Sequence, residues 1–311
     1  MELHPTPFTR DLLHPRYWLT WLGMGLWWLV AQLPYPVLMK LGRGLGKILY
    51  ATGGSRRRIA LRNIQLCFPE LSSEEQEALV KENFANYGMG LFEVPIAWWW
   101  SDKRLDRILH IDGLENIYNL NGSGALLMAM HFTHLELGGQ ALARHVSADA
   151  VYRVHKNAVY EYIQTKGRKV RSPGSVAYPR KDVRGITRAL RAGRVIWYAP
   201  DHDLGPVGSV FVPFFGIEAA TITATSKLAQ LGKAKVVPFS HVRRADGSGY
   251  DVRVHPPLEN FPSSDEVADA RRVNEIVEGF VRRHPEQYLW AHRRFKTRPP
   301  GQPSLYSRSG A

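Results

Sequence analysis

The amino-acid sequence predicts an α/β fold, in which helices flank a mostly parallel central sheet and an N-terminal membrane-anchoring helix comes first. The first observation is the apolar run 125–130, which follows two glycines and is typical of a strand buried on both faces. The second is the alternation of strand-like and helical segments along the rest of the chain. The third is the apolar stretch 17–33, whose length is at the lower limit for a membrane span.

The N-terminal part is predicted to attach the protein to a membrane. Residues 17–33 are followed by many basic residues between Lys40 and Arg62, which favours a body on the cytoplasmic side. A small-residue cleavage site, as in a signal peptide, is not seen after this stretch. Whether it spans the bilayer or lies in one leaflet stays open. We expect a membrane anchor and amphipathic helix over 1–50 and an α/β domain over 51–311.

The remaining elements follow from apolar periodicity and from the positions of glycine and proline. Thr133 is the expected N-cap of the helix after the first strand, and residues 246–249 are an expected hairpin turn. We predict strands over 125–130, 150–154, 195–199, 234–241 and 250–254, helices over 56–67, 72–100, 135–145, 158–170, 185–192, 222–232 and 264–284, and an apolar loop over 211–216.

His131 lies where the first buried strand gives way to a helix. In an open α/β sheet, this carboxyl end of the strands is where ligands bind. Glu136 follows five residues later, and a carboxylate beside an imidazole holds its tautomer and stabilises the imidazolium. The pair is therefore predicted to be a general base with an orienting partner. Two alternatives stay open at this point: Thr133 and Glu136 form a capping box, or His131 is a satisfied core histidine.

Composition narrows the classes of partner. The net charge of +13 indicates an acidic partner. Nucleic-acid-binding motifs are not seen, whereas nine tryptophans and the apolar N-terminus favour an anionic membrane. His131 and His134 together could be two ligands of a metal ion. The only cysteine, Cys67, lies far away in sequence and so does not add a nearby ligand. We therefore expect no metal.

Polar residues also follow the predicted strand 195–199. Asp201 and Asp203 flank a histidine in this loop. Such a loop can position a polar substrate, can hold a metal, or can simply be solvated.

Four segments, taken in order, strongly resemble the late (secondary) acyltransferases of lipid A biosynthesis. They are residues 62–69, 131–136, 197–214 and 285–299, and the resemblance runs over nearly the whole chain to about Tyr306. It implies a glycerolipid-acyltransferase-like fold and an O-acyltransferase. The implied reaction moves a fatty acyl chain, laurate or similar, from acyl carrier protein to the hydroxyl of a 3-hydroxyacyl chain on a lipid A precursor.

The resemblance also implies a site and a location. The family dyad carries over to His131 as the general base and Glu136 as its orienting carboxylate. The location implied is the inner membrane, with the active site on the cytoplasmic face. Acyl carrier protein is then a co-substrate, and no cofactor is expected. The residues that we expect to bind substrate are Arg153, Asn157, Arg180, Asp201 and Asp203.

Other functions stay open from the residues alone. The acceptor could be another glycolipid, because the chemistry of the dyad is indifferent to the headgroup. A metal-dependent lipid hydrolase would use His131, His134 and an aspartate of residues 201–203. A non-catalytic lipid-binding protein is the third alternative. The sequence leaves the acyl chain length and the acceptor position open.

Overall fold

The structure is a computed structural model that describes residues 7–152 and 154–306. Its centre is a seven-stranded sheet with the order β1-β9-β8-β2-β5-β3-β4. The strands are β1 Leu109–Asp112, β2 Ala125–Met128, β3 Ala148–Tyr152, β4 Ala177–Pro179, β5 Val195–Tyr198, β8 Lys235–Arg243 and β9 Tyr250–Val254. Neighbouring strands are parallel except β8 and β9, which form an antiparallel hairpin. The predicted α/β class with a mostly parallel sheet is confirmed.

Strand β2 lies at the middle of the sheet because its sequence is apolar on both sides. All four of its residues are buried, and it pairs in parallel with β5 on one side and β8 on the other. A strand with helices over both faces needs such a continuous apolar run. The carboxyl end of β2 therefore opens at the centre of the molecule.

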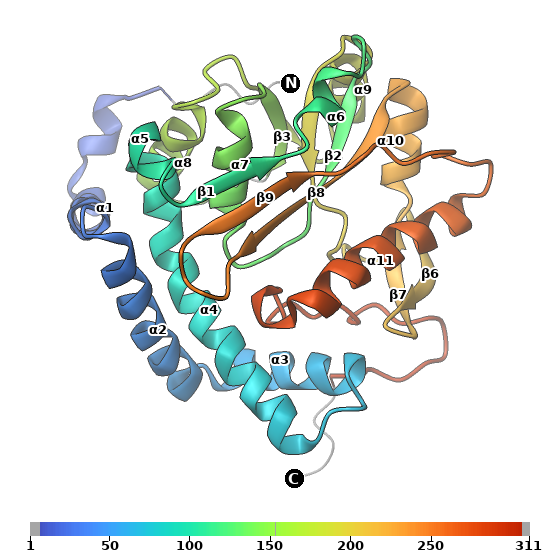
Figure 1. Ribbon diagram of the computed structural model, residues 1–311, viewed down its shortest axis with the longest axis horizontal. Helices are drawn as coiled ribbons and strands as arrows, with labels where there is room; N and C mark the ends of the chain where they lie inside the picture. Colours follow the sequence, from blue (N-terminus) through green and yellow to red (C-terminus); the bar gives the residue numbers. More distant parts are fainter. Residues whose placement is uncertain (1–6, 153, 307–311) are drawn as a thin grey trace.

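Helices cover both faces and one edge of this sheet (Figure 1). Their bounds are α1 Trp18–Ala31, α2 Tyr35–Thr52, α3 Gly54–Cys67, α4 Ser73–Trp99, α5 Asp102–Leu105, α6 Glu115–Tyr118, α7 Leu135–Ala143, α8 Ala158–Lys169, α9 Val183–Arg191, α10 Ala224–Gly232 and α11 Glu266–Arg283. Short 3₁₀ turns occur at Arg10–Leu13, Pro15–Tyr17 and Pro285–Gln287. The long helix α4 begins at a capping box between Ser72 and Glu75.

Helices α2 and α4 pack closely along their lengths (Figure 1). The approach depends on glycine: a Cβ atom added to Gly88 would lie 2.1 Å from the carbonyl oxygen of Gly42, and one on Gly46 would lie 2.4 Å from that of Phe84. Only glycine lets the two backbones come this near. Leu38 of α2 is consequently buried in the same core as the end of α4.

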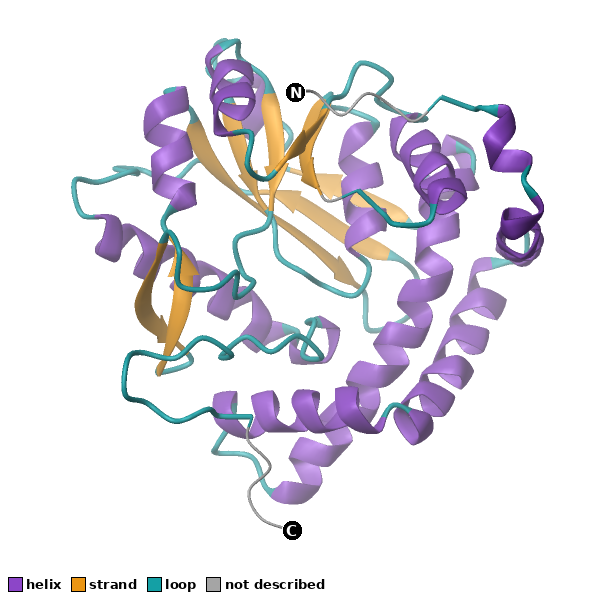
Figure 2. Ribbon diagram, turned by 180° about the vertical axis from the view of Figure 1, so that it is seen from behind, coloured by secondary structure: helices purple, strands orange, loops and turns teal. Residues whose placement is uncertain are grey.

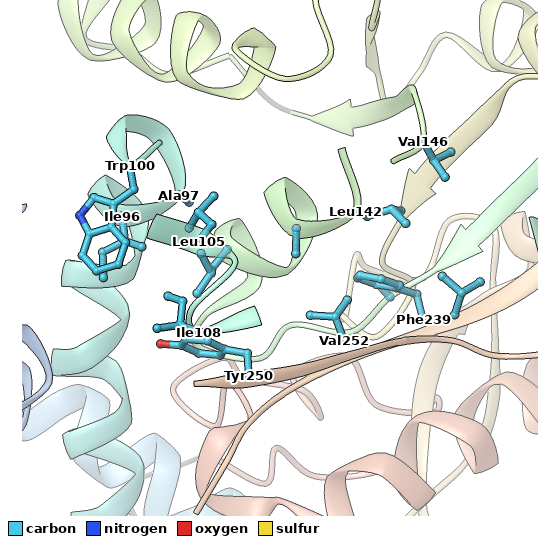
Figure 3. Close-up of a cluster of buried hydrophobic side chains, with 14 of the residues drawn as sticks. Ile96, Ala97, Trp100, Leu105, Ile108, Leu142, Val146, Phe239, Tyr250 and Val252 are labelled. Carbon is cyan, nitrogen blue, oxygen red and sulfur yellow. The ribbon is translucent and has the colours of Figure 1, made fainter. Parts of the chain in front are cut away.

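One hydrophobic cluster joins the end of α4 to α7 and the sheet. Figure 3 shows Ile96 and Trp100 on one side of this cluster and Leu142, Phe239 and Val252 on the other. Burying side chains of this size stabilises the fold by about 1.5–3 kcal/mol each. The cluster fixes the position of α4 relative to α7, and so determines which α4 side chains reach the start of α7.

Helix α1 leaves large apolar side chains uncovered. The exposed ones include Trp18, Leu19, Leu22, Leu26 and Leu29, and the side chain of Leu19 is 80% exposed. A soluble surface does not usually concentrate apolar side chains on one short helix.

Within residues 7–152 and 154–306, none of the helices has both the length and the apolar character required to cross a membrane.

The predicted loop 211–216 is wrong. Residues 209–214 form β6, which pairs antiparallel with β7, residues 217–222. Figure 2 shows this hairpin apart from the main sheet. Phe215 and Gly216 both have positive φ, at 50° and 74°, which is what a two-residue turn between paired strands requires. Pro213 fits this structure because it lies in a two-stranded ribbon, where an edge is available to it.

Candidate active site

Two neighbouring parallel strands bring His131 and Asp201 together. Met128 at the end of β2 lies in register with Tyr198 at the end of β5, and His131 and Asp201 each follow three residues later. The Nδ1 atom of His131 is 2.6 Å from Oδ1 of Asp201. The backbone N–H of His131 donates to the second carboxylate oxygen at 2.9 Å. Asp201 thus holds both the ring and the backbone of the histidine.

The charge on Asp201 depends on this contact. Burial alone would raise the pKa of its carboxyl group, but the imidazole and N–H of His131 outweigh burial and hold that pKa well below its usual range. The carboxylate is therefore ionised and accepts the Nδ1 proton. In that tautomer Nε2 carries the lone pair. Among the described residues, no hydrogen bond occupies Nε2, and the ring borders a cavity.

Glu136 does not make the predicted hydrogen bond to His131. Its carboxylate accepts two hydrogen bonds from Arg168, from Nε at 2.8 Å and from Nη2 at 2.7 Å. The indole N–H of Trp98 donates to the same group at 2.7 Å. Burial opposes ionisation of Glu136, yet the charge and hydrogen bonds of Arg168 outweigh it and leave the pKa lowered. The carboxylate that contacts the imidazole is therefore Asp201 and not Glu136.

The local reason is where α7 begins. The helix starts at Leu135, its N-cap is His134, and it has no side-chain cap. The expected cap at Thr133 is wrong: its hydroxyl oxygen accepts no backbone N–H of α7, and its own backbone N–H donates to the carbonyl of Gln287 in the C-terminal segment. The capping box is consequently absent at α7. Glu136 instead faces α4 and α8, from which Trp98 and Arg168 come.

His131 and Glu136 still line one cavity, which we call the site cavity. Its volume is about 250 Å³. It runs from His131 along α7 and is bordered on the other side by β3, including Ala148, Ala150 and Val151. A second cavity of about 470 Å³, the outer cavity, lies between α1, the end of α4 and α8. Trp98 lines the outer cavity while its N–H bonds Glu136 of the site cavity.

Two more histidines stack behind His131. The ring of His202 lies parallel to it with centroids 3.5 Å apart, and His292 stacks on His202 at 4.0 Å. Burial lowers the pKa of His202 to about 3 and that of His292 to about 4. These rings are neutral near pH 7, and they pack in a stack with the ring of His131.

The other predicted site residues have different surroundings. Asn157 caps α8 by accepting from the backbone N–H groups of Val159 and Tyr160. Asp203 is buried and accepts from the backbone N–H and hydroxyl of Thr297 at 2.6 and 2.8 Å, which ties the β5 loop to the C-terminal segment. Arg180 is exposed after β4. Arg153 lies outside the described residues. The structure brings none of Asn157, Arg180 and Asp203 to the lining of the site cavity.

The metal set of the hydrolase alternative is not assembled. His134 is buried and bonds the carbonyl of His241 at 3.0 Å through Nε2, away from the aspartates. Within the described residues, the group with metal-ligand spacing is His131, Asp201 and His202, whose ligand atoms lie within 4.8 Å of one another. In this group Nδ1 of His131 and the Asp201 carboxylate already bond each other at 2.6 Å.

Two deeply buried histidines predict acid sensitivity. Burial holds the pKa of His134 well below its ordinary value and lowers that of His241 to about 4. Above pH ~6.5 neither the folded nor the unfolded state protonates them; below it only the unfolded state does. The free energy of unfolding should fall by about 1.4 kcal/mol per pH unit for each histidine as the pH drops below ~6.5, and the contribution of His241 ends near its folded-state pKa of about 4.

Chemical unfolding measured at several pH values checks this expectation. A His241→Phe variant should show a shallower fall, since one titrating group is gone. A free energy of unfolding that stays constant across this window would contradict the assignment of both rings as neutral.

The chain matches known proteins along nearly its full length. A family model described as bacterial lipid A biosynthesis acyltransferase matches residues 6–297. The lipid A biosynthesis lauroyltransferase of Escherichia coli (strain K12) is 47% identical over 302 residues, which cover 96% of this chain and 98% of the relative. The palmitoleoyltransferase of that organism is 43% identical with the same coverage. Its myristoyltransferase is 32% identical over 309 residues, 97% of this chain and 94% of the relative.

Proposed function

The chain belongs to the bacterial lipid A biosynthesis acyltransferases, and from that premise we propose that it moves a fatty acyl chain from acyl carrier protein to a lipid A precursor. The acceptor is the hydroxyl of a 3-hydroxyacyl chain, and the donated chain is laurate or one of similar length. Membership of the family makes the protein an O-acyltransferase. The donor and the catalytic roles are the proposal.

The observation that carries the mechanism is the oriented imidazole of His131 at the mouth of a largely apolar cavity. Nε2 takes the proton of the acceptor hydroxyl, and the oxygen attacks the thioester carbonyl. Asp201 stabilises the imidazolium that forms. The tetrahedral intermediate then expels the thiolate, which receives the proton from His131. Cys67 is buried and takes no part, and burial raises the pKa of its thiol.

Glu136 acts as a fixed negative charge in the same cavity. Its ion pair with Arg168 and its bond from Trp98 hold the carboxylate in one position, and an ionised group there favours the cationic form of His131 in the transition state. In this mechanism orientation and charge come from two different carboxylates. The thioester is already activated, so a base and electrostatic stabilisation suffice.

Mass spectrometry of lipid A from cells with and without the gene tests the proposed function. Loss of the gene should remove one secondary acyl chain from the lipid, and the purified protein should restore it with an acyl carrier protein thioester. Unchanged lipid A in cells without the gene, together with no transfer by the purified protein, would contradict the proposal. Transfer to another glycolipid only would keep the chemistry and replace the acceptor.

We also propose that α1 lies in one leaflet of an anionic inner membrane, with the active site on the cytoplasmic side. The exposed leucines of α1 and the net charge of +13 support this. Replacing Leu19, Leu22, Leu26 and Leu29 with serine should lower partition onto anionic vesicles at least about tenfold, because apolar area no longer enters the lipid. Sedimentation with vesicles measures it.

The matched control changes exposed apolar residues far from α1. Leu231 and Val267 are 46% and 45% exposed, and their replacement by serine should leave vesicle binding unchanged. Equal binding by the α1 variant and the unaltered protein would remove α1 as the contact.

A further inference from the structure

We propose that a basic face at the start of α9 is the docking surface for the acyl carrier protein that delivers the thioester. The inference rests on the proposed function and deepens it, since it names where the donor protein binds. We call this face the basic patch. It consists of Arg180, Lys181, Arg184 and Arg188, and all four residues are exposed.

The basic patch begins at the same edge of the sheet as His131. Met128 of β2 lies level with Tyr198 of β5, and the pairing of β3 with β5 and β4 brings Tyr178 of β4 to the same level. Arg180 follows β4 at this edge. The ends of β2 and β4 are three strand spacings apart, which is about 14 Å. A carrier that holds its thioester on a flexible arm can dock at the patch and reach His131.

The charges of the basic patch have no partner in the fold. Other exposed arginines pair with carboxylates, for example Arg43 with Glu82 at 2.7 Å. Within the described part of the chain, no ion pair joins any residue of the patch to an acidic side chain. Asp182, which lies among these residues in sequence, is the N-cap of α9 and accepts the backbone N–H of Gly185 at 2.9 Å. The four cations are therefore available to an acidic partner.

Two of these cations are unfavourable for the helix that carries them. Arg184 lies in the first turn of α9, which contains no acidic residue, and the helix dipole disfavours a cation there. Arg188 follows four residues later on the same face, and like charges at this spacing destabilise a helix. Folding does not account for this pair, whereas attraction of an acidic protein does.

An uncovered apolar side chain accompanies the basic patch. Val207, in the loop after β5, is 92% exposed. The carbonyl of the next residue, Gly208, accepts the backbone N–H of Thr223, the N-cap of α10, and α10 packs against α9. Protein interfaces combine apolar contacts with a polar rim. Val207 and the patch therefore suit a protein partner.

The position of the patch favours a carrier from solution over the bilayer. Helix α1, the proposed membrane contact, packs against α4 and α8, whereas α9 packs against α10 and β5. Figure 1 shows α1 at the left margin of the molecule and α9 near the top, to the right of the centre. A protein that lies on a membrane through α1 thus leaves α9 free for a second partner.

The test reverses two charges of the patch, in the double variant Arg184→Glu with Arg188→Glu. With lauroyl acyl carrier protein as donor, kcat/KM should fall at least about tenfold, because electrostatic attraction speeds association by that much or more. With lauroyl pantetheine, a thioester without the carrier protein, kcat/KM should be unchanged. Added salt should lower transfer from the carrier more in the unaltered protein than in the variant. Glutamate suits the first turn of a helix, so the variant should fold.

The matched control is the double variant Lys103→Glu with Arg107→Glu. These two residues are also exposed and four positions apart, and the change in net charge is the same. They lie in and just after α5, on the left of Figure 1. The kcat/KM values for both donors should equal those of the unaltered protein.

Equal losses with both donors overturn the proposal, because the patch then acts on the acceptor or on the fold. Unchanged kcat/KM with the carrier overturns it as well; if vesicle binding falls instead, the partner of the patch is the membrane. Failure of the proposed function is distinguishable, because the unaltered protein then transfers laurate from neither donor, or from lauroyl pantetheine alone.

Discussion

Replacing His131 with alanine is expected to lower the turnover of acyl transfer by roughly 10²–10⁴-fold, the usual worth of a positioned general base. The hydroxyl of a 3-hydroxyacyl chain is a poor nucleophile until its proton is removed. In this protein His131 borders the site cavity, and Asp201 holds its Nδ1 atom at 2.6 Å, which leaves Nε2 as the other ring nitrogen. Single-turnover measurement with a saturating thioester separates this chemical step from binding.

The control for this variant is His145→Ala. His145 is exposed beyond α7 and outside the lining of the site cavity, so its replacement should leave turnover unchanged. His131→Ala leaves the buried Asp201 carboxylate without its partner, and a lower melting temperature is expected as well. A folded His131→Ala protein with turnover near that of the unaltered enzyme would exclude His131 as the base.

The position of the site was predictable from the sequence, and its composition only partly so. A buried apolar run that ends at His131 and a second strand that ends before Asp201 both place polar residues at the carboxyl edge of a sheet. The order of the strands was not readable. Strands β2 and β5 are neighbours although α7, β3, α8, β4 and α9 lie between them in sequence. Because this adjacency could not be predicted, Glu136 was predicted to be the partner of His131, since it is the nearest carboxylate in sequence. Asp201 lies 70 residues away and was predicted to be a substrate-binding residue of a loop.

The same limit explains the other differences. Thr133 has the sequence of an N-cap, but its N–H bonds Gln287, more than a hundred residues later. Arg168 gave no signal in the sequence because its importance depends on how α8 packs against the start of α7. The 209–222 hairpin was missed because residues 211–216 were predicted to be a loop. For Thr133 and Arg168, local propensity was overruled by a contact between segments that are far apart in the chain.

The two carboxylates of the site contact different groups, so we expect their substitutions to lower turnover by different amounts. Asp201 touches the imidazole directly. Glu136 touches Arg168 and Trp98. Glu136→Gln keeps the shape of the side chain, loses the ion pair, and should lower turnover at least about tenfold through the lost charge. Because its partner Arg168 lies in a partly buried position, the melting temperature should fall as well.

Asp201→Asn is expected to cost more turnover than Glu136→Gln, up to about 10⁴-fold, which is the size of the same change in a serine protease triad. An amide at this position can donate its N–H to Nδ1 of His131. The ring then carries its proton on Nε2, and the atom that should accept the hydroxyl proton no longer has a lone pair. The backbone N–H of His131 can still bond the amide oxygen, so the geometry is kept while the tautomer is changed.

Turnover of the two variants as a function of pH, with melting temperatures measured alongside, decides between the two carboxylates. If Asp201 orients the base, Asp201→Asn shows the larger loss in turnover, while substrate binding measured as KM changes little. In Glu136→Gln the tautomer is unchanged, and the loss is the smaller, electrostatic one. A larger loss for Glu136→Gln, with Asp201→Asn near the unaltered enzyme, would return the orienting role to Glu136. It would also require α7 to rotate on substrate binding, because Arg168 and Trp98 occupy the Glu136 carboxylate in this structure.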